Sequence, residues 1–210
     1  LVLSIYYTFG TIAGRYAEMN TLLSNIIFIL TFIIPILTMR ILTEDRKSGT
    51  EVMLVTSPVE VYEIVIGKYL ASLTVFLVIY VLTFTYPIII AALGGKMEIP
   101  MLLGGYLAFL LIGMSFIAVG VFASSLTENQ IVAAIIGFVI LLVIHLVDPI
   151  ANYVGGVLAK ILGIFSLLSR YEDLNSGILD ITSIIYYLSF TAVFLFLTTR
   201  VIDKRRWSQG

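Results

Sequence analysis

The sequence is poor in charged residues and contains no cysteine. Of its 210 residues, 60% are hydrophobic and only 12% are charged. Soluble domains carry roughly twice that charged fraction, about 25%, so this chain has too few ionisable side chains to cover a globular surface. The composition therefore excludes an ordinary soluble enzyme and predicts a membrane protein.

The other scarcities exclude several kinds of site. The absence of cysteine excludes disulfides, thiolate metal sites and cysteine nucleophiles. The single histidine, His145, has no second histidine with which to build a metal site. A net charge of −1 gives no basic footprint for nucleic acid. We therefore expect no metal, no cofactor on this chain and no nucleic-acid partner.

The scarce charges are separated by uncharged stretches of 19 to 29 residues. About 20 apolar residues cross the hydrocarbon core of a bilayer, and only helices or closed barrels satisfy their backbone there. The sequence predicts an all-α polytopic membrane bundle, a single domain over residues 1–210. The predicted full spans lie near residues 20–42, 66–93, 100–125, 129–148 and 182–202.

Residues 1–9 form a sixth apolar piece that is too short to span. We interpret it as the end of a first span that begins before Leu1, which gives six spans in the full protein. A cleaved signal peptide is the alternative, but no basic start and no small-residue cleavage site support it.

Basic residues favour the cytoplasmic side of a membrane. If the spans alternate, the 43–65 loop with its flanks and the C-terminal tail share one side and hold eight of the twelve basic residues. The opposite side holds Arg15, Lys96, Lys160 and Arg170. We therefore expect the 43–65 loop and both termini of the full protein in the cytoplasm, at the plasma or inner membrane.

Two connections between spans are long. In the cytoplasmic loop, Ser48-Gly49 predicts a helix stop, and Thr50 can cap a short apolar helix over 52–55. Ser57-Pro58-Val59-Glu60 has the pattern of a capping box, which predicts a helix starting at Pro58. The external segment 149–180 has apolar residues at helical spacing over 154–168, which favours an interfacial or re-entrant helix.

A few residues within the spans could have a function or a purely structural role. His145 and Asp148 could form a relay pair or could simply lie at a wet helix end. Gly113-Met114-Ser115 only faintly matches an intramembrane serine protease. Pro35 and Pro87 predict kinks. Three small-residue pairs predict close helix packing, either within one subunit or between two: Gly104/Ala108, Gly120/Ser124 and Ala133/Gly137.

The run ILTEDRKSGTEVMLVTSPVEVYEIVIGKYLA, residues 41–71, resembles the cytoplasmic loop of type-two ATP-binding-cassette (ABC) permeases. It is most similar to the branch of gliding-motility and copper-enzyme-maturation permeases. SRYEDLNSGILD and the ending Lys204-Arg205-Arg206-Trp207 resemble the same branch, so the similarity extends over about residues 20–207. The amphipathic helix that precedes the first span in that family is absent here. The loop positions that match, and that we predict to form an ATPase-coupling loop, are Glu44, Arg46, Gly49, Thr50, Glu51, Leu54, Ser57, Pro58, Gly67 and Lys68.

The resemblance implies a permease subunit, of an exporter, that is driven by a separate ABC ATPase. Glu44 and Arg46 would contact that ATPase, Gly49 would permit the turn, and residues 52–55 would fill a groove on it. ATP and Mg²⁺ would be bound by the ATPase, and a second permease subunit would complete the pathway. The chain's own Gly67-Lys68 is no phosphate loop, because Tyr62 replaces its first glycine.

Two other classes are alternatives. A secondary transporter or channel that works without an ATPase would have polar residues in mid-membrane and broken, repeated helices, whereas these spans are nearly free of charge. A membrane enzyme would need a catalytic constellation that the sequence does not offer.

Overall fold

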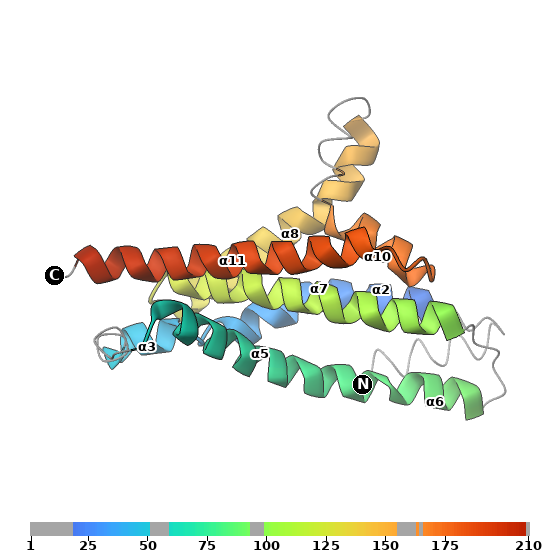
Figure 1. The fold of residues 1–210 in the computed structure, drawn as a ribbon, viewed down its shortest axis with the longest axis horizontal. Helices are drawn as coiled ribbons and strands as arrows, with labels where there is room; N and C mark the ends of the chain where they lie inside the picture. Colours follow the sequence, from blue (N-terminus) through green and yellow to red (C-terminus); the bar gives the residue numbers. More distant parts are fainter. Residues whose placement is uncertain (1–18, 51–58, 93–98, 155–162, 164–165, 209–210) are drawn as a thin grey trace.

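The computed structural model describes residues 19–50, 59–92, 99–154, 163 and 166–208, which form helices joined by short turns. The helices run roughly along the long axis of the molecule, apart from the end of α8 (Figure 1). They are α2 (Met19–Thr38), α3 (Thr43–Lys47), α5 (Val61–Thr83), α6 (Thr85–Ala92), α7 (Ile99–Leu126), α8 (Gln130–Val154), α10 (Leu167–Asn175) and α11 (Ile181–Ser208).

Within the described residues, five helical segments are long and apolar enough to cross a membrane: Leu23–Lys47, Val61–Ile89, Ile99–Leu126, Gln130–Ala151 and Ile181–Arg205. These five segments coincide with the five predicted full spans. The predicted partial span at 1–9 lies outside the described residues.

Several boundaries differ from the prediction. The span predicted near 66–93 begins at Val61 rather than at 66. The helix predicted to end at 148 continues through Pro149 to Val154. Most of the external helix predicted over 154–168 lies outside the described residues, while the polar run that follows it forms α10.

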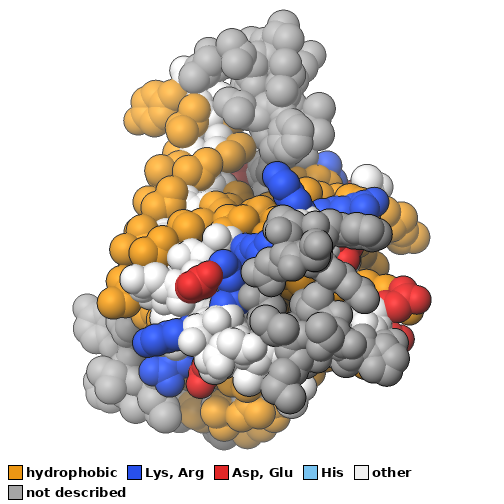
Figure 2. Space-filling model, turned by 90° about the vertical axis from the view of Figure 1, so that its left-hand side faces the viewer, with side chains coloured by type: hydrophobic (Ala, Val, Ile, Leu, Met, Phe, Trp, Pro, Cys, Tyr) orange, Lys and Arg blue, Asp and Glu red, His pale blue; other side chains and the backbone are white. Residues whose placement is uncertain are grey.

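Helix α7 occupies the centre of the bundle and packs against α2, α5, α8, α10 and α11. Over an 18-residue apolar stretch of α7, 78% of the residues are buried, compared with 22% for the stretches in Val61–Ile89 and Ile181–Arg205 and 17% for the one in Gln130–Ala151. The outer helices therefore expose the large apolar side chains that a bilayer would cover. Figure 2 views the molecule along its long axis, with orange hydrophobic side chains on its flanks and blue and red charges at the near end.

The glycines of α7 are sites of close approach within the subunit. A Cβ atom on Gly104 would lie 2.3 Å from the carbonyl oxygen of Leu174 in α10. A Cβ on Gly113 would meet the ring of Phe76 in α5, and one on Gly120 would meet Thr38 at the end of α2. The sequence did not decide whether the small-residue pairs containing Gly104 and Gly120 pack within one subunit or between two. In the structure, both glycines pack inside one subunit.

The candidate span Val61–Ile89 is interrupted at Phe84, between α5 and α6. Pro87 has no N–H to donate to the carbonyl of Thr83, four residues before it. The hydroxyl of Tyr106 in α7 donates to that carbonyl at 2.7 Å instead. The helix is therefore interrupted three residues before Pro87, where the sequence predicts a kink, and a side chain from the neighbouring helix satisfies the backbone group that the proline leaves free.

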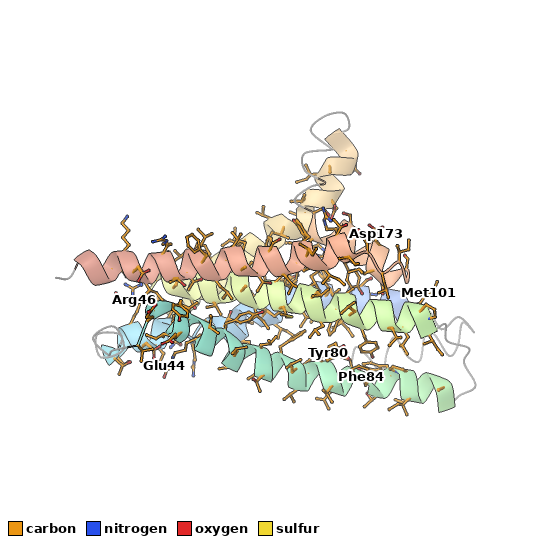
Figure 3. All side chains as sticks on the ribbon, in the orientation of Figure 1. Glu44, Arg46, Tyr80, Phe84, Met101 and Asp173 are labelled. Atoms are coloured by element: carbon orange, nitrogen blue, oxygen red, sulfur yellow. The ribbon has the colours of Figure 1, made fainter. Side chains whose placement is uncertain are left out.

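An aromatic cluster surrounds this break. Tyr80 and Phe84, labelled in Figure 3, lie against Tyr106, with ring centroids 5.8 Å and 4.2 Å from its own. The hydroxyl of Tyr80 donates to the carbonyl of Tyr106 at 3.4 Å. Tyr80 and Tyr106 therefore join α5 to α7.

Removing the Tyr106 hydroxyl should destabilise the bundle, because Tyr106→Phe leaves the Thr83 carbonyl buried without its donor. The expected loss is about 1–3 kcal/mol, measurable as a lower melting temperature of the detergent-purified protein. Pro87→Ala restores an N–H that can reach Thr83, so Tyr106→Phe should cost less in that background. Equal costs in the two backgrounds would show that Pro87 and Tyr106 are not coupled.

Candidate functional site

The short helix α3 carries the first half of the predicted coupling loop. It runs from Thr43 to Lys47 and ends at Ser48, whose hydroxyl donates to the carbonyl of Glu44 at 2.8 Å. Gly49 follows with φ of +75°, a left-handed conformation that favours glycine. The predicted helix stop at Ser48-Gly49 is confirmed, and it turns the chain away from α3.

An ion pair joins α3 to the turn between α7 and α8. The guanidinium of Arg46 lies 2.6 Å from a carboxylate oxygen of Glu128, two residues before α8. The Arg46 side chain is only 17% exposed, whereas that of Glu128 is 64% exposed. Arg46 therefore points towards its own subunit, although the resemblance implied a contact with the ATPase.

A second ion pair joins α3 to α5. The ammonium group of Lys68 lies 2.6 Å from a carboxylate oxygen of Asp45, and both side chains are largely covered. Lys68 lies about two turns into α5, so the pair fixes the loop against the inner part of a membrane span. Figure 3 shows Glu44 and Arg46 together at this end of the molecule, and Asp173 towards the other.

The start of α5 corrects the predicted helix start at Pro58. Glu60 is extended, with φ of −74° and ψ of 145°, and the helix begins at Val61. The backbone N–H of Glu60 donates to the carboxylate of Glu63 at 3.3 Å, so the capping box begins at Glu60 rather than at Ser57. The two glutamates have the same three-residue spacing as Ser57 and Glu60, one turn later.

The remaining predicted loop residues divide into two groups. Glu44, Gly49 and Thr50 are exposed at the end of α3, and Gly67 is exposed on α5 with no heavy atom within 4 Å of where a Cβ would stand. The other four, Glu51, Leu54, Ser57 and Pro58, lie outside the described residues, together with the predicted short helix over 52–55. The structure thus brings Glu44, Arg46 and Lys68 to one end of the molecule and separates the exposed residues from the ion-paired ones.

Sequence reasoning missed the two acidic partners, Asp45 and Glu128. Asp45 was visible only as one charge among many in the loop. Glu128 is an isolated acidic residue in a tight turn, on the same predicted side of the membrane as Arg46. This placement was the one signal that could have identified Glu128 as a partner of Arg46.

The opposite end of the bundle contains His145 and Asp148. The His145 ring lies 5.3 Å from that of Phe28 in α2, and its Nδ1 has no hydrogen-bond partner among the described residues. The described residues contain no group of three His, Cys, Asp or Glu side chains that could hold a metal.

In the neighbouring α10, burial raises the pKa of the Tyr171 hydroxyl, so this group stays neutral at physiological pH.

The weak protease pattern has a structural explanation. The Ser115 hydroxyl is buried within α7, donates to the carbonyl of Leu111 at 3.1 Å and lies 3.3 Å from the hydroxyl of Thr191 in α11. These contacts are those of a serine that joins two helices rather than those of a nucleophile activated by a base.

The fold and this loop define a class of protein, a multi-pass helical membrane protein with a charged loop that is ion-paired to one span and to the turn between two others. A family model described as ABC-2 family transporter protein matches residues 7–209. The chain belongs to this family and is a membrane permease; the matched region is not an ATPase domain. No curated protein and no solved structure matches the chain.

Proposed function

We propose that this chain is the permease subunit of an exporter powered by a separate ABC ATPase that docks on the loop formed by α3 and the residues after it. The ion pairs that attach this loop to α5 and to the turn before α8 carry the proposal. A surface that receives force from an ATPase must be exposed and also rigidly joined to the spans that move. The exposed part of this surface consists of Glu44, Gly49 and Thr50. Two ion pairs connect it to the rest of the permease, namely Arg46–Glu128 and Lys68–Asp45.

In this proposal the loop faces the cytoplasm, as do both termini of the full protein. The charged end in Figure 2 supports this orientation, since Lys47 of α3, Lys68 of α5 and Arg200 and Lys204 of α11 lie on elements that reach that end. ATP and Mg²⁺ would bind on the ATPase, and a second permease subunit would complete the pathway. The single-domain organisation over 1–210 and the gliding-motility or copper-enzyme-maturation branch belong to the same proposal.

Family membership favours this function over an ATPase-independent secondary transporter or channel. The structure adds a change in residue roles. Glu44 would contact the ATPase directly, whereas Arg46 and Lys68 would position the loop from within the permease.

Co-purification tests the proposal. The full-length protein is expressed with the ABC ATPase encoded beside it, and a stoichiometric complex is expected. Glu44→Lys reverses an exposed charge and Gly49→Pro is incompatible with a φ of +75°, so both should lose most of the bound ATPase. Asp173→Lys, an equal charge reversal at an exposed residue of α10, is the matched control and should retain it.

All three variants must elute as monodisperse protein, so that a lost complex reports docking rather than misfolding. If Glu44→Lys and Gly49→Pro bind the ATPase as well as Asp173→Lys does, the loop is not the docking surface. If the wild type forms no complex, the ATP-driven function is wrong for this chain.

A further inference from the structure

A groove with a volume of about 720 Å³ opens between the end of α2 with α3 on one side and α5 on the other. It lies where two candidate spans, Leu23–Lys47 and Val61–Ile89, reach the charged end of the molecule. Its size is within the roughly 300–1,000 Å³ of small-molecule sites.

The polar rim of the groove has two positive and two negative groups: Arg40 and Lys68, and Glu44 and Asp45. Lys68 and Asp45 neutralise each other at 2.6 Å. Arg40 and Glu44 are both exposed, and neither has an ion-pair partner in the part of the chain that the structure describes. The rim therefore offers one positive and one negative group to a ligand.

Apart from the Ser72 hydroxyl, which donates to the carbonyl of Lys68 at 2.8 Å, the walls become apolar towards the membrane interior. Leu37 and Ile41 form one wall, and Ala71 and Val75 form the other. Val75 lies about 10 Å deeper along α5 than Lys68, at 1.5 Å per residue. Beyond it, Val78 and Leu82 continue the same face at helical spacing, and the three side chains are 50%, 60% and 61% exposed. The groove is thus charged at the membrane surface and is extended into the membrane by an uncovered apolar stripe.

We propose that this groove binds one phospholipid with a phosphoethanolamine headgroup. The Arg40 guanidinium would bind the phosphate, since guanidinium forms bidentate hydrogen bonds with phosphate oxygens. The Glu44 carboxylate would accept from the ammonium group, and the acyl chains would lie along Val75, Val78 and Leu82. A zwitterionic headgroup matches the one positive and one negative group of the rim. A phosphoglycerol headgroup has no cationic group, so it would leave the Glu44 carboxylate without a partner.

Native mass spectrometry of the purified full-length protein tests this proposal without any ATPase. The protein is incubated with micelles containing equal amounts of phosphatidylethanolamine and phosphatidylglycerol, and the retained lipids are counted and identified. The wild type should retain one phosphatidylethanolamine in preference to phosphatidylglycerol. Arg40→Gln should retain about tenfold less of either lipid, as expected for a lost charge-assisted hydrogen bond.

Two more variants separate the parts of the site. Glu44→Gln should keep a bound lipid but lose the preference for ethanolamine, because only the contact to the ammonium group is weakened. Val75→Trp should fill the groove and reduce retention of both lipids. Arg200→Gln, at an exposed arginine of α11 that does not line the groove, is the matched control and should behave as the wild type.

Three results would overturn the site. One is equal retention of the two lipids by the wild type. Another is retention by Arg40→Gln and Val75→Trp that matches retention by Arg200→Gln, which would indicate a non-specific lipid annulus. The third is a wild type that retains no lipid, which would mean that the groove is empty or covered by protein.

Discussion

Gly104→Ala is expected to lower the melting temperature of the bundle by roughly 5–10 °C, or to prevent folding. The added Cβ would lie 2.3 Å from the carbonyl oxygen of Leu174 and 3.2 Å from the Cα of Gly177. Both obstacles are backbone atoms, so no side-chain rotation can relieve the clash, and α10 must move off α7. Such overpacking costs about 1–3 kcal/mol or more, and each kcal/mol shifts the midpoint by about 2–4 °C in a chain of this size.

Size-exclusion chromatography after heating in detergent measures this effect. Gly67→Ala is the matched control, because a Cβ there meets no heavy atom within 4 Å. It removes a glycine from the interior of α5, so it should stabilise the protein by about 0.5–1 kcal/mol. The same chemical change thus has opposite expected signs at two helical glycines. Melting of Gly104→Ala at the wild-type temperature would contradict the packing described for α7 and α10.

Arg46→Glu is expected to reduce ATPase coupling about tenfold or more in the reconstituted complex. The substitution replaces a 2.6 Å ion pair with two facing carboxylates at a side chain that is only 17% exposed, so the loop should move away from α8. A tenfold loss corresponds to 1.4 kcal/mol, which is reasonable for reversal of a partly buried pair. The measurement is permease-stimulated ATP hydrolysis.

The double reversal, Arg46→Glu with Glu128→Arg, distinguishes positioning from direct contact. If Arg46 acts by holding α3 against the α7–α8 turn, the reversed pair should recover most of the lost coupling. If Arg46 instead binds the ATPase, the second substitution restores nothing. No recovery in a well-folded double variant would therefore contradict the positioning role that the geometry supports.

The spans could be predicted from the sequence because one physical rule governs them, namely that charge is expelled from hydrocarbon. The gap between Lys68 and Lys96 is enough to locate a span, whatever lies beside it. The start of α5 was misplaced by about one turn because Ser57/Glu60 and Glu60/Glu63 both satisfy the capping-box spacing. Local sequence rules do not decide which of two capping boxes, separated by a single turn, begins the helix.

The contacts at the candidate site could not be predicted, because they depend on how distant segments approach. Arg46 and Glu128 are 82 residues apart, and nothing near either of them indicates the other. The Thr83 carbonyl is a similar case. Pro87 predicted a kink, but only the packing of α7 on α5 shows that Tyr106 donates to the Thr83 carbonyl.

The central position of α7 has a consequence for the order of assembly. This helix lies near the middle of the chain, with α2 and α5 before it and α8, α10 and α11 after it. During synthesis the earlier helices can cover only part of its surface, and the contacts with α8, α10 and α11 must wait for the second half of the chain. Until then, lipid covers the surface over Gly104, and α10 must displace that lipid as it docks, whereas the earlier helices α5 and α2 already cover Gly113 and Gly120.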